Sequence, residues 1–355
     1  MSLIRFQEYD GAFSVDEMEF YKRMSSSEED IVAICGTLVS GIGNKYSDFD
    51  VHVFCRERPK LTAAHFDNHD WVSSGDGIWV SPGEIPENSK LRGTWDFWDE
   101  LDRSIDIKYW EMNEIKETCS DFHQRYVDST KDLGFMKHSD FSTYGIGDST
   151  LFAKLFEALV VLNADKFDDI ISPFSKEQYC YLAYRYHTPV YDDFRDILGA
   201  YKSGDMDTTI SFLRQYCENV AWSFSHLLMS PNTNRKWVSA LVSRWPAPYL
   251  ELSKIYQQSL NSNLKNLDEK KEYIRRMLNW SDDIFSKSID ILETIDTFVS
   301  PREIDDFWRS NLIERAGKKI TSEQSKQEYI WYSRLGRKDA VRLSTFLEIE
   351  YDESK

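Results

Sequence analysis

Long apolar runs are missing from this chain of 355 residues. No uncharged stretch approaches the roughly 18 apolar residues that a helix needs to span a bilayer. The N-terminal segment MSLIRFQEYDGAF contains acidic residues and lacks an apolar core followed by a small-residue cleavage site, so it does not resemble a secretory signal. We therefore expect a soluble, cytoplasmic protein without a membrane partner.

Cysteine is also scarce. The five thiols are an odd number, are widely spaced and include no Cys-x-x-Cys pair. This pattern gives no support for a disulfide framework, a zinc site or a redox centre. We expect the five cysteines to be ordinary buried residues.

Positive charge is in deficit. The chain has 43 Lys and Arg residues against 60 Asp and Glu residues, which gives a net charge of −17. Such a field repels polyanions and attracts cations. Nucleic acid is therefore a poor candidate partner.

Two common phosphate-binding motifs are absent as well. A P-loop built on the glycines near residue 40 would need lysine at position 42, which is Ile42. The GIG sequence does not continue into the dinucleotide-binding motif GxGxxG, because position 46 is Tyr46. Neither a P-loop nor a dinucleotide-binding motif is predicted.

The chain itself indicates an α+β fold with two domains. IVAICG, DVHVFC and SIDIKYWEM are short apolar or alternating segments that predict strands within the first 110 or so residues. From about Ser149 onward, longer segments with apolar residues three and four apart predict helices, the first of them in LFAKLFEALVVL. We predict a small mixed-sheet domain over residues 1–145 and a larger all-α domain over residues 146–355.

The stretch GTLVSGIGNKYSDFDVHVFC, residues 36–55, carries the chemistry. Gly36 and Gly41 permit tight or left-handed backbone, and Thr37 adds a hydroxyl donor. Glycine-rich turns of this kind commonly bind phosphate oxygens. Phosphate is therefore the first ligand to expect here.

Two carboxylates follow the turn. Asp48 and Asp50 lie one residue apart at the start of a predicted strand, so they share a face with Cα atoms about 6.6 Å apart. Two anions on one face favour a hard divalent cation between them, and Mg²⁺ often binds one or two carboxylates together with substrate phosphates. Asp106, in the strand-like SIDIKYWEM, supplies a third carboxylate for a two-metal site.

These residues resemble the signature of the nucleotidyltransferase superfamily, which includes DNA polymerase β and the aminoglycoside nucleotidyltransferases. The family pattern is an apolar strand, Gly-Gly or Gly-Ser, a short spacer and Asp-x-Asp at a strand start, with a third acid on a later strand. Gly36, Thr37, Gly41 and the Ser47-Asp48-Phe49-Asp50 run match it, and Asp106 matches the third acid. Thr37 replaces the commoner serine, and Ser40 stands where many relatives have a basic residue.

The resemblance implies a catalytic domain of nucleotidyltransferase fold and a helical domain that closes the nucleotide and acceptor cleft. It implies that Asp48, Asp50 and Asp106 bind two Mg²⁺ or Mn²⁺ ions and that Asp106 acts as the general base. Gly36, Thr37, Gly41 and Ser47 would contact the nucleotide. Such helical domains often present a lysine to the phosphates, and Lys236 in NTNRKWVSAL is the candidate.

Two further segments leave alternatives open. WDFWDELD, residues 95–102, fits either an acceptor pocket that stacks on a ring and attracts a cation, or an amphipathic segment with buried rings and solvated acids, which we favour. The basic residues near the C-terminus could reach a phosphate or form a solvated helix face, which we again favour; they are Arg334, Arg337, Lys338 and Arg342.

The expected function is metal-dependent transfer of a nucleoside monophosphate, with AMP from ATP as the first pair to consider, to a hydroxyl of a small acceptor. An antibiotic-like, cationic acceptor is the family analogy. Two alternatives stay open: adenylylation of a protein partner, as in antitoxin-type members, and nucleotide binding with weak or no catalysis. The sequence does not indicate an oligomeric state.

Overall fold

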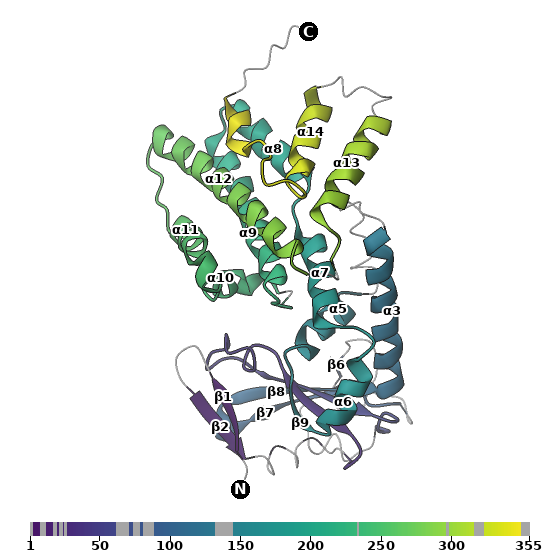
Figure 1. Ribbon diagram of the computed structural model, residues 1–355. Helices are drawn as coiled ribbons and strands as arrows, with labels where there is room; N and C mark the ends of the chain where they lie inside the picture. The colour runs from purple at the N-terminus through teal and green to yellow at the C-terminus, as the bar shows by residue number, and fades with distance from the viewer. Residues whose placement is uncertain are drawn as a thin grey trace. The chain divides into compact units, whose positions relative to one another are not determined.

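A computed structural model of the chain describes residues 3–7, 12–16, 20, 24, 27–61, 71–73, 79–80, 89–131, 145–232, 234–295, 298–315 and 323–348. The chain divides into two compact units, the first comprising Met1–Gln124 and Thr150–Ser175 and the second Arg125–Ser149 and Lys176–Lys355. A smaller N-terminal sheet region and a larger helical region confirm the mixed α and β class (Figure 1). This division does not coincide with the predicted boundary at residue 145, since residues 125–149 belong to the second unit and residues 150–175 to the first.

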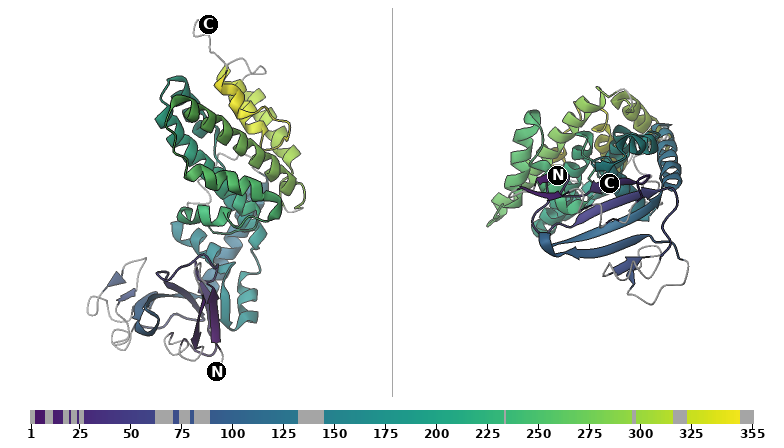
Figure 2. Two further views of the ribbon diagram at one scale, coloured as in Figure 1. Left: turned by 90° about the vertical axis from the view of Figure 1, so that its left-hand side faces the viewer. Right: turned by 90° about the horizontal axis from the view of Figure 1, so that it is seen from below.

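The first unit is built on a seven-stranded sheet with the order β6-β5-β7-β8-β4-β3-β9. Its strands lie side by side in the view from below in Figure 2. Strands β4 and β8 run parallel, whereas the other described pairs in the sheet are antiparallel. In chain order the strands are β3 (Ile31–Cys35), β4 (Phe49–Cys55), β5 (Trp71–Ser73), β6 (Trp79–Val80), β7 (Gly93–Trp98), β8 (Arg103–Glu111) and β9 (Leu159–Leu162).

One face of this sheet forms the apolar core of the unit. Alternate residues of β4 and β8 are buried there, as the alternating sequence predicts, with Phe49 and Ile105 both within 1% of full burial. A separate antiparallel hairpin, β1 (Leu3–Gln7) and β2 (Ala12–Asp16), packs on the same core. The ring of Phe6 in that hairpin lies 5.2 Å from the ring of Phe49.

The opposite face of the sheet carries the candidate site residues Asp50 and Asp106. Toward the end of β4 it is covered by α6 (Ala164–Ile171), where Phe167 packs 5.8 Å from Phe54. Further aromatic contacts link α3 (Met112–Lys131) and α5 (Gly145–Leu155), where the rings of Phe122 and Phe152 are 4.9 Å apart. Toward the start of β4 this face is lined by charged side chains instead.

The segment LFAKLFEALVVL was predicted to be one helix, and this prediction is wrong in its second half. Helix α5 ends at Leu155, and Leu159–Leu162 forms β9, which pairs antiparallel with β3. A short apolar run with two valines fits a strand as well as a helix, and its pairing with the edge of β3 decides between them.

The second unit is helical, as predicted from Ser149 onward. Its long central helix α9 packs against α7, α8 and α12 (Figure 1). Asn266 caps the N-terminus of α12 by accepting a hydrogen bond from the Glu269 N–H at 2.9 Å. The helices are α7 (Lys176–His187), α8 (Tyr191–Lys202), α9 (Met206–Leu227), α10 (Val238–Val242), α11 (Leu250–Leu260), α12 (Leu267–Leu292), α13 (Pro301–Arg315) and α14 (Glu323–Ser333), with 3₁₀ turns η2 (Arg235–Trp237), η3 (Ala247–Tyr249) and η4 (Leu343–Leu347).

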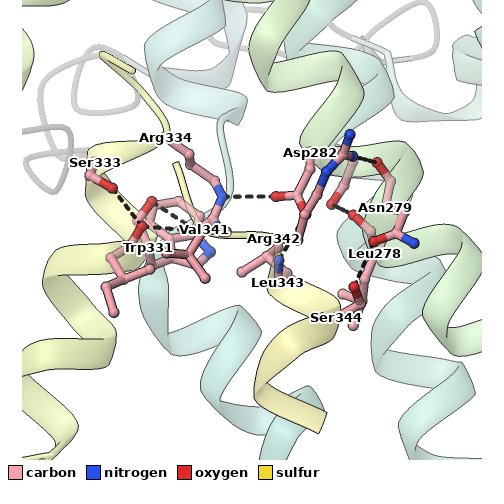
Figure 3. A network of polar contacts seen from close by, with 12 residues as sticks. Leu278, Asn279, Asp282, Trp331, Ser333, Arg334, Val341, Arg342, Leu343 and Ser344 are labelled. Atoms are coloured by element: carbon pink, nitrogen blue, oxygen red, sulfur yellow. Dashed lines mark hydrogen bonds and ion pairs between the residues drawn. The ribbon is translucent and has the colours of Figure 1, made fainter. Parts of the chain in front are cut away.

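Of the C-terminal basic residues, Arg337, Lys338 and Arg342 are exposed, in line with the solvated surface that we favoured, whereas Arg334 is not. Arg334 is 2% exposed, and its Nε donates to Asp282 Oδ1 of α12 at 3.1 Å (Figure 3). Lys338 pairs with Asp290 at 2.8 Å, and Arg342 pairs with Asp283 at 2.6 Å. These cations are therefore matched by acidic residues of α12.

None of the helices in the described ranges is long and apolar enough to cross a membrane. The five cysteines are buried thiols, as predicted.

Candidate active site on the sheet

The candidate site begins where β3 ends, at a turn from Gly36 to Gly43. The φ angles of Gly36 and Gly41 are +84° and +67°, in the left-handed region that favours glycine. A Cβ atom on Gly36 would also lie 2.3 Å from Oδ2 of Asp50. Both predicted glycines therefore turn the chain, and Gly36 also makes room for a predicted carboxylate.

The backbone N–H groups of this turn form two sets. Those of residues 40–43 donate to carbonyl oxygens of the same turn. Those of Thr37 to Val39 donate to no other described residue. Successive N–H groups at the start of a helical turn are suited to anion oxygens. Phosphate would therefore meet the amides of Thr37 to Val39 rather than that of Gly41, which donates to Leu38 O at 3.3 Å.

Two of the three predicted carboxylates lie side by side. In the parallel pairing of β4 with β8, Asp50 is directly opposite Asp106. Neighbouring residues in such a pair project from the same face of the sheet. The structure thus joins residues that are 56 positions apart in sequence.

Each of these carboxylates has a lysine partner. Lys154 of α5 lies 2.6 Å from Asp50 Oδ1, and the two side chains are 24% and 16% exposed. Lys108 of β8 lies 3.2 Å from Asp106 Oδ2, with 37% and 19% exposed. The charges of the two acids are therefore compensated within the first unit.

Asp106 is the less well satisfied of the two acids. Its Oδ1 atom is buried and has no hydrogen-bond partner. Burial raises the pKa of Asp106 above its ordinary value, and the neighbouring Asp50 adds to this, while Lys108 opposes it. The side chain therefore favours a proton or an added cation at Oδ1.

Lys154 is held as a cation. Burial alone lowers its pKa, but the charge and the hydrogen bond of Asp50 outweigh burial, so that the pKa of Lys154 is raised. Sequence reasoning missed this residue. The available signal was a single lysine within the otherwise apolar LFAKLF.

His52 lies next to these ion pairs, two residues after Asp50 on the same face of β4. Its Nδ1 accepts a hydrogen bond from Trp110 Nε1 at 2.9 Å, which places the imidazole proton on Nε2. The Nε2 atom is buried without a partner. Burial, with Lys154 and Lys108 nearby, lowers the pKa of His52 well below its ordinary value, so the ring is neutral.

The third predicted carboxylate occupies a different setting. Asp48 precedes β4 and is exposed. The loop before it is held by Arg103, which donates from Nη1 to Asn44 O at 3.0 Å and to Ser47 O at 2.9 Å. Ser47 Oγ accepts a hydrogen bond from the Asn44 N–H at 3.0 Å. The Ser47 hydroxyl, which was predicted to contact the nucleotide, therefore stabilises its own loop.

The carboxylates of Asp50 and Asp106 meet part of the requirement for a divalent cation site. Asp50 and Asp106 offer neighbouring carboxylate oxygens, the ligands that Mg²⁺ prefers, and two carboxylates suffice where substrate phosphates complete the shell. Within the described ranges, however, no group of three or more His, Cys, Asp or Glu side chains could hold a metal ion. The Asp48, Asp50 and Asp106 site for two ions therefore stays a prediction.

Lys236, the predicted phosphate ligand, belongs to the second unit. It lies in η2, is exposed, and its Nζ is 5.4 Å from the ring centroid of Trp237. Its proposed contact with phosphate stays a prediction. In the first unit, Lys154 and Lys108 are lysines that contact the candidate acids Asp50 and Asp106.

A scan of the sequence against protein-family models gives no match, and a search of curated proteins gives none.

Proposed function

We propose that this chain is a metal-dependent nucleotidyltransferase that transfers a nucleoside monophosphate to a hydroxyl of a small acceptor, with AMP from ATP as the first pair to test. The observation that carries the proposal is the direct pairing of Asp50 with Asp106 on parallel strands beside the Gly36 turn. Two carboxylates thus lie beside a turn in which the N–H groups of Thr37 to Val39 donate to no other described residue.

The roles of the residues follow from their surroundings. Asp50 and Asp106 would hold Mg²⁺, which when bound offsets phosphate charge and lowers the pKa of the acceptor hydroxyl. The N–H groups of Thr37 to Val39 would donate to phosphate oxygens. When nucleotide binds, the ammonium group of Lys154 would leave Asp50 and contact a phosphate oxygen instead, since this group is already present at the site.

In the proposed transfer, one bond to phosphorus forms and one breaks. The acceptor oxygen forms a bond to the α-phosphorus, and the bond from that phosphorus to the bridging oxygen of pyrophosphate breaks. Pyrophosphate leaves with the bonding electron pair, and the hydroxyl proton passes to Asp106. A partly desolvated carboxylate with a raised pKa is a stronger base than an exposed one, which suits Asp106 for this step.

The test is release of pyrophosphate from labelled ATP with Mg²⁺, in the presence of a low-molecular-weight cell extract as a source of acceptors. We expect release by the intact chain, none with EDTA, and none with Asp50→Asn. Asp196→Asn, an exposed acid of α8, is the matched control and should retain full activity. Label on protein instead of a small molecule would indicate the protein-modifying alternative.

One observation favours a second candidate, a nucleotide-binding protein without turnover. Both carboxylates already have lysine partners, and these ammonium groups could bind a nucleotide phosphate without any metal. In that case ATP would bind equally well with and without Mg²⁺, and no pyrophosphate would be released under any condition.

A further inference from the structure

One row of side chains crosses the polar face of the sheet from β5 to β4. The strand register pairs Trp71 with Trp95, Trp95 with Asp106, and Asp106 with Asp50. Side chains of directly paired residues lie on one face, with antiparallel Cβ atoms about 4.5–5.5 Å apart. Two tryptophans therefore continue the row that the two carboxylates begin.

Phe97 widens this aromatic surface. It follows Trp95 by two residues on β7, so the two side chains share a face. Trp71 is 45% exposed and Phe97 is 40% exposed, and Trp95 is half-buried. Trp98, on the other face, is in the core. We call Trp71, Trp95 and Phe97 the aromatic strip.

The strand order decides which reactant the aromatic strip faces. The order β5-β7-β8-β4-β3 places the strip on the β8 side of the carboxylate pair and the Gly36 turn on the β3 side. The proposed function assigns the phosphates to the turn. The other reactant then approaches from the side of the strip.

We propose that the aromatic strip is the acceptor subsite and that it binds a flat ring carrying positive charge. The link to the reaction rests on the proposed function. Exposed indole and phenyl faces stack on flat rings and attract cations. The net charge of −17 disfavours an anionic acceptor.

The experiment uses simple probes, because the natural acceptor is unidentified. Binding of 1-methylquinolinium, a flat cation, to the full chain is followed by NMR of ¹⁵N-labelled tryptophan side chains. Uncharged quinoline at pH 8 isolates the effect of charge, and choline isolates the effect of the ring. We expect the flat cation to bind at least about fivefold more tightly than either.

Substitutions assign the binding to the strip. Trp71→Ala should weaken 1-methylquinolinium binding at least about fivefold, and Trp71→Phe should restore part of it. Phe212→Ala, which removes a ring that is 40% exposed on α9, should leave binding unchanged. No saturable binding to the intact chain, or equal binding by Trp71→Ala, would overturn the proposal.

One competition result and one comparison of binding with turnover separate this proposal from the proposed function. Displacement of the probe by ATP but not by inorganic triphosphate would assign the strip to the nucleobase and overturn the acceptor assignment. Probe binding requires neither ATP nor metal. If it is observed without pyrophosphate release under any condition, the ring-binding surface is supported while its role as an acceptor subsite fails together with the transferase.

Discussion

Two sets of ion pairs, one in each unit, differ in how completely their polar atoms are satisfied. In the helical unit, Arg334 and Asp282 are 2% and 9% exposed, and Asp282 Oδ2 also accepts from the Leu343 N–H at 2.8 Å. Arg334 donates in addition to the carbonyl oxygens of Trp331 and Val341, at 3.0 and 2.9 Å (Figure 3). Burial raises the pKa of Asp282, and Arg334 opposes that rise.

On the sheet, the pairs of Asp50 with Lys154 and of Asp106 with Lys108 are less complete. Their side chains are partly exposed, and two buried atoms nearby, Asp106 Oδ1 and His52 Nε2, have no partner. A fully satisfied buried pair is typical of a structural role, whereas unsatisfied buried groups need an explanation such as a ligand. The Arg334 pair thus fits a structural role, and Asp106 Oδ1 is an unsatisfied carboxylate atom that the proposed function would explain.

The largest expected effect is the loss of nucleotidyl transfer when Asp50 or Asp106 is neutralised. Asp50→Asn or Asp106→Asn should reduce nucleotidyl transfer at least about a thousandfold, because one neutral amide leaves a single carboxylate to hold the metal. Initial rates of pyrophosphate release provide the measurement. Activity within tenfold of the intact chain would remove either residue from the catalytic site.

The second effect concerns stability in the helical unit. Arg334→Met should lower the free energy of unfolding by about 3–5 kcal/mol, since it leaves Asp282 buried without a cation. Lys154→Met should cost less, about 1–3 kcal/mol, because Asp50 keeps some contact with water. Urea denaturation compares the two. Equal costs would contradict the contrast between the two sets of ion pairs.

Gly36 offers a test of intermediate size. Gly36→Ala combines a φ of +84° with a Cβ atom 2.3 Å from Asp50, and we expect a loss of about 1–3 kcal/mol in stability together with a clear loss of activity. Gly204→Ala is the matched control, because its φ is +82° but nothing lies within 4 Å. Equal activity in the two variants would show that contact with Asp50 is unimportant.

The smallest effect is a pH dependence of stability. The raised pKa of Asp106 means that the folded protein binds this proton more readily than the unfolded chain. The contribution of Asp106 to the free energy of unfolding therefore becomes destabilising as the pH rises from 3.8, the ordinary pKa, through the raised pKa of the folded protein. Asp106→Asn should be more stable than the intact chain at pH 7, by up to about 1 kcal/mol, and the difference should vanish at pH 3. A constant difference between these pH values would contradict the shift.

Much of the first unit could be predicted from the sequence. Alternation in DVHVFC and SIDIKYWEM predicts β4 and β8, and the Gly36 turn follows from glycine chemistry. The pairing of Asp50 with Asp106 was predicted as proximity, but the register that makes them direct neighbours depends on long-range strand pairing, which no local pattern encodes.

The predictions that failed share one cause, namely contacts between distant segments. The strand Leu159–Leu162 exists because the edge of β3 is available to it. Arg334 is buried because α12 supplies Asp282. Lys154 was missed for the same reason, because it reaches Asp50 across 104 positions in the sequence.

The most direct test of the central claim is the binding of Mn²⁺ in the presence of a non-hydrolysable ATP analogue, measured by electron paramagnetic resonance. The account predicts that the intact chain binds Mn²⁺ with the analogue, that Asp50→Asn and Asp106→Asn lose this binding, and that Asp196→Asn retains it. Equal Mn²⁺ binding by the intact chain and by both site variants would contradict a metal and nucleotide site at the paired carboxylates.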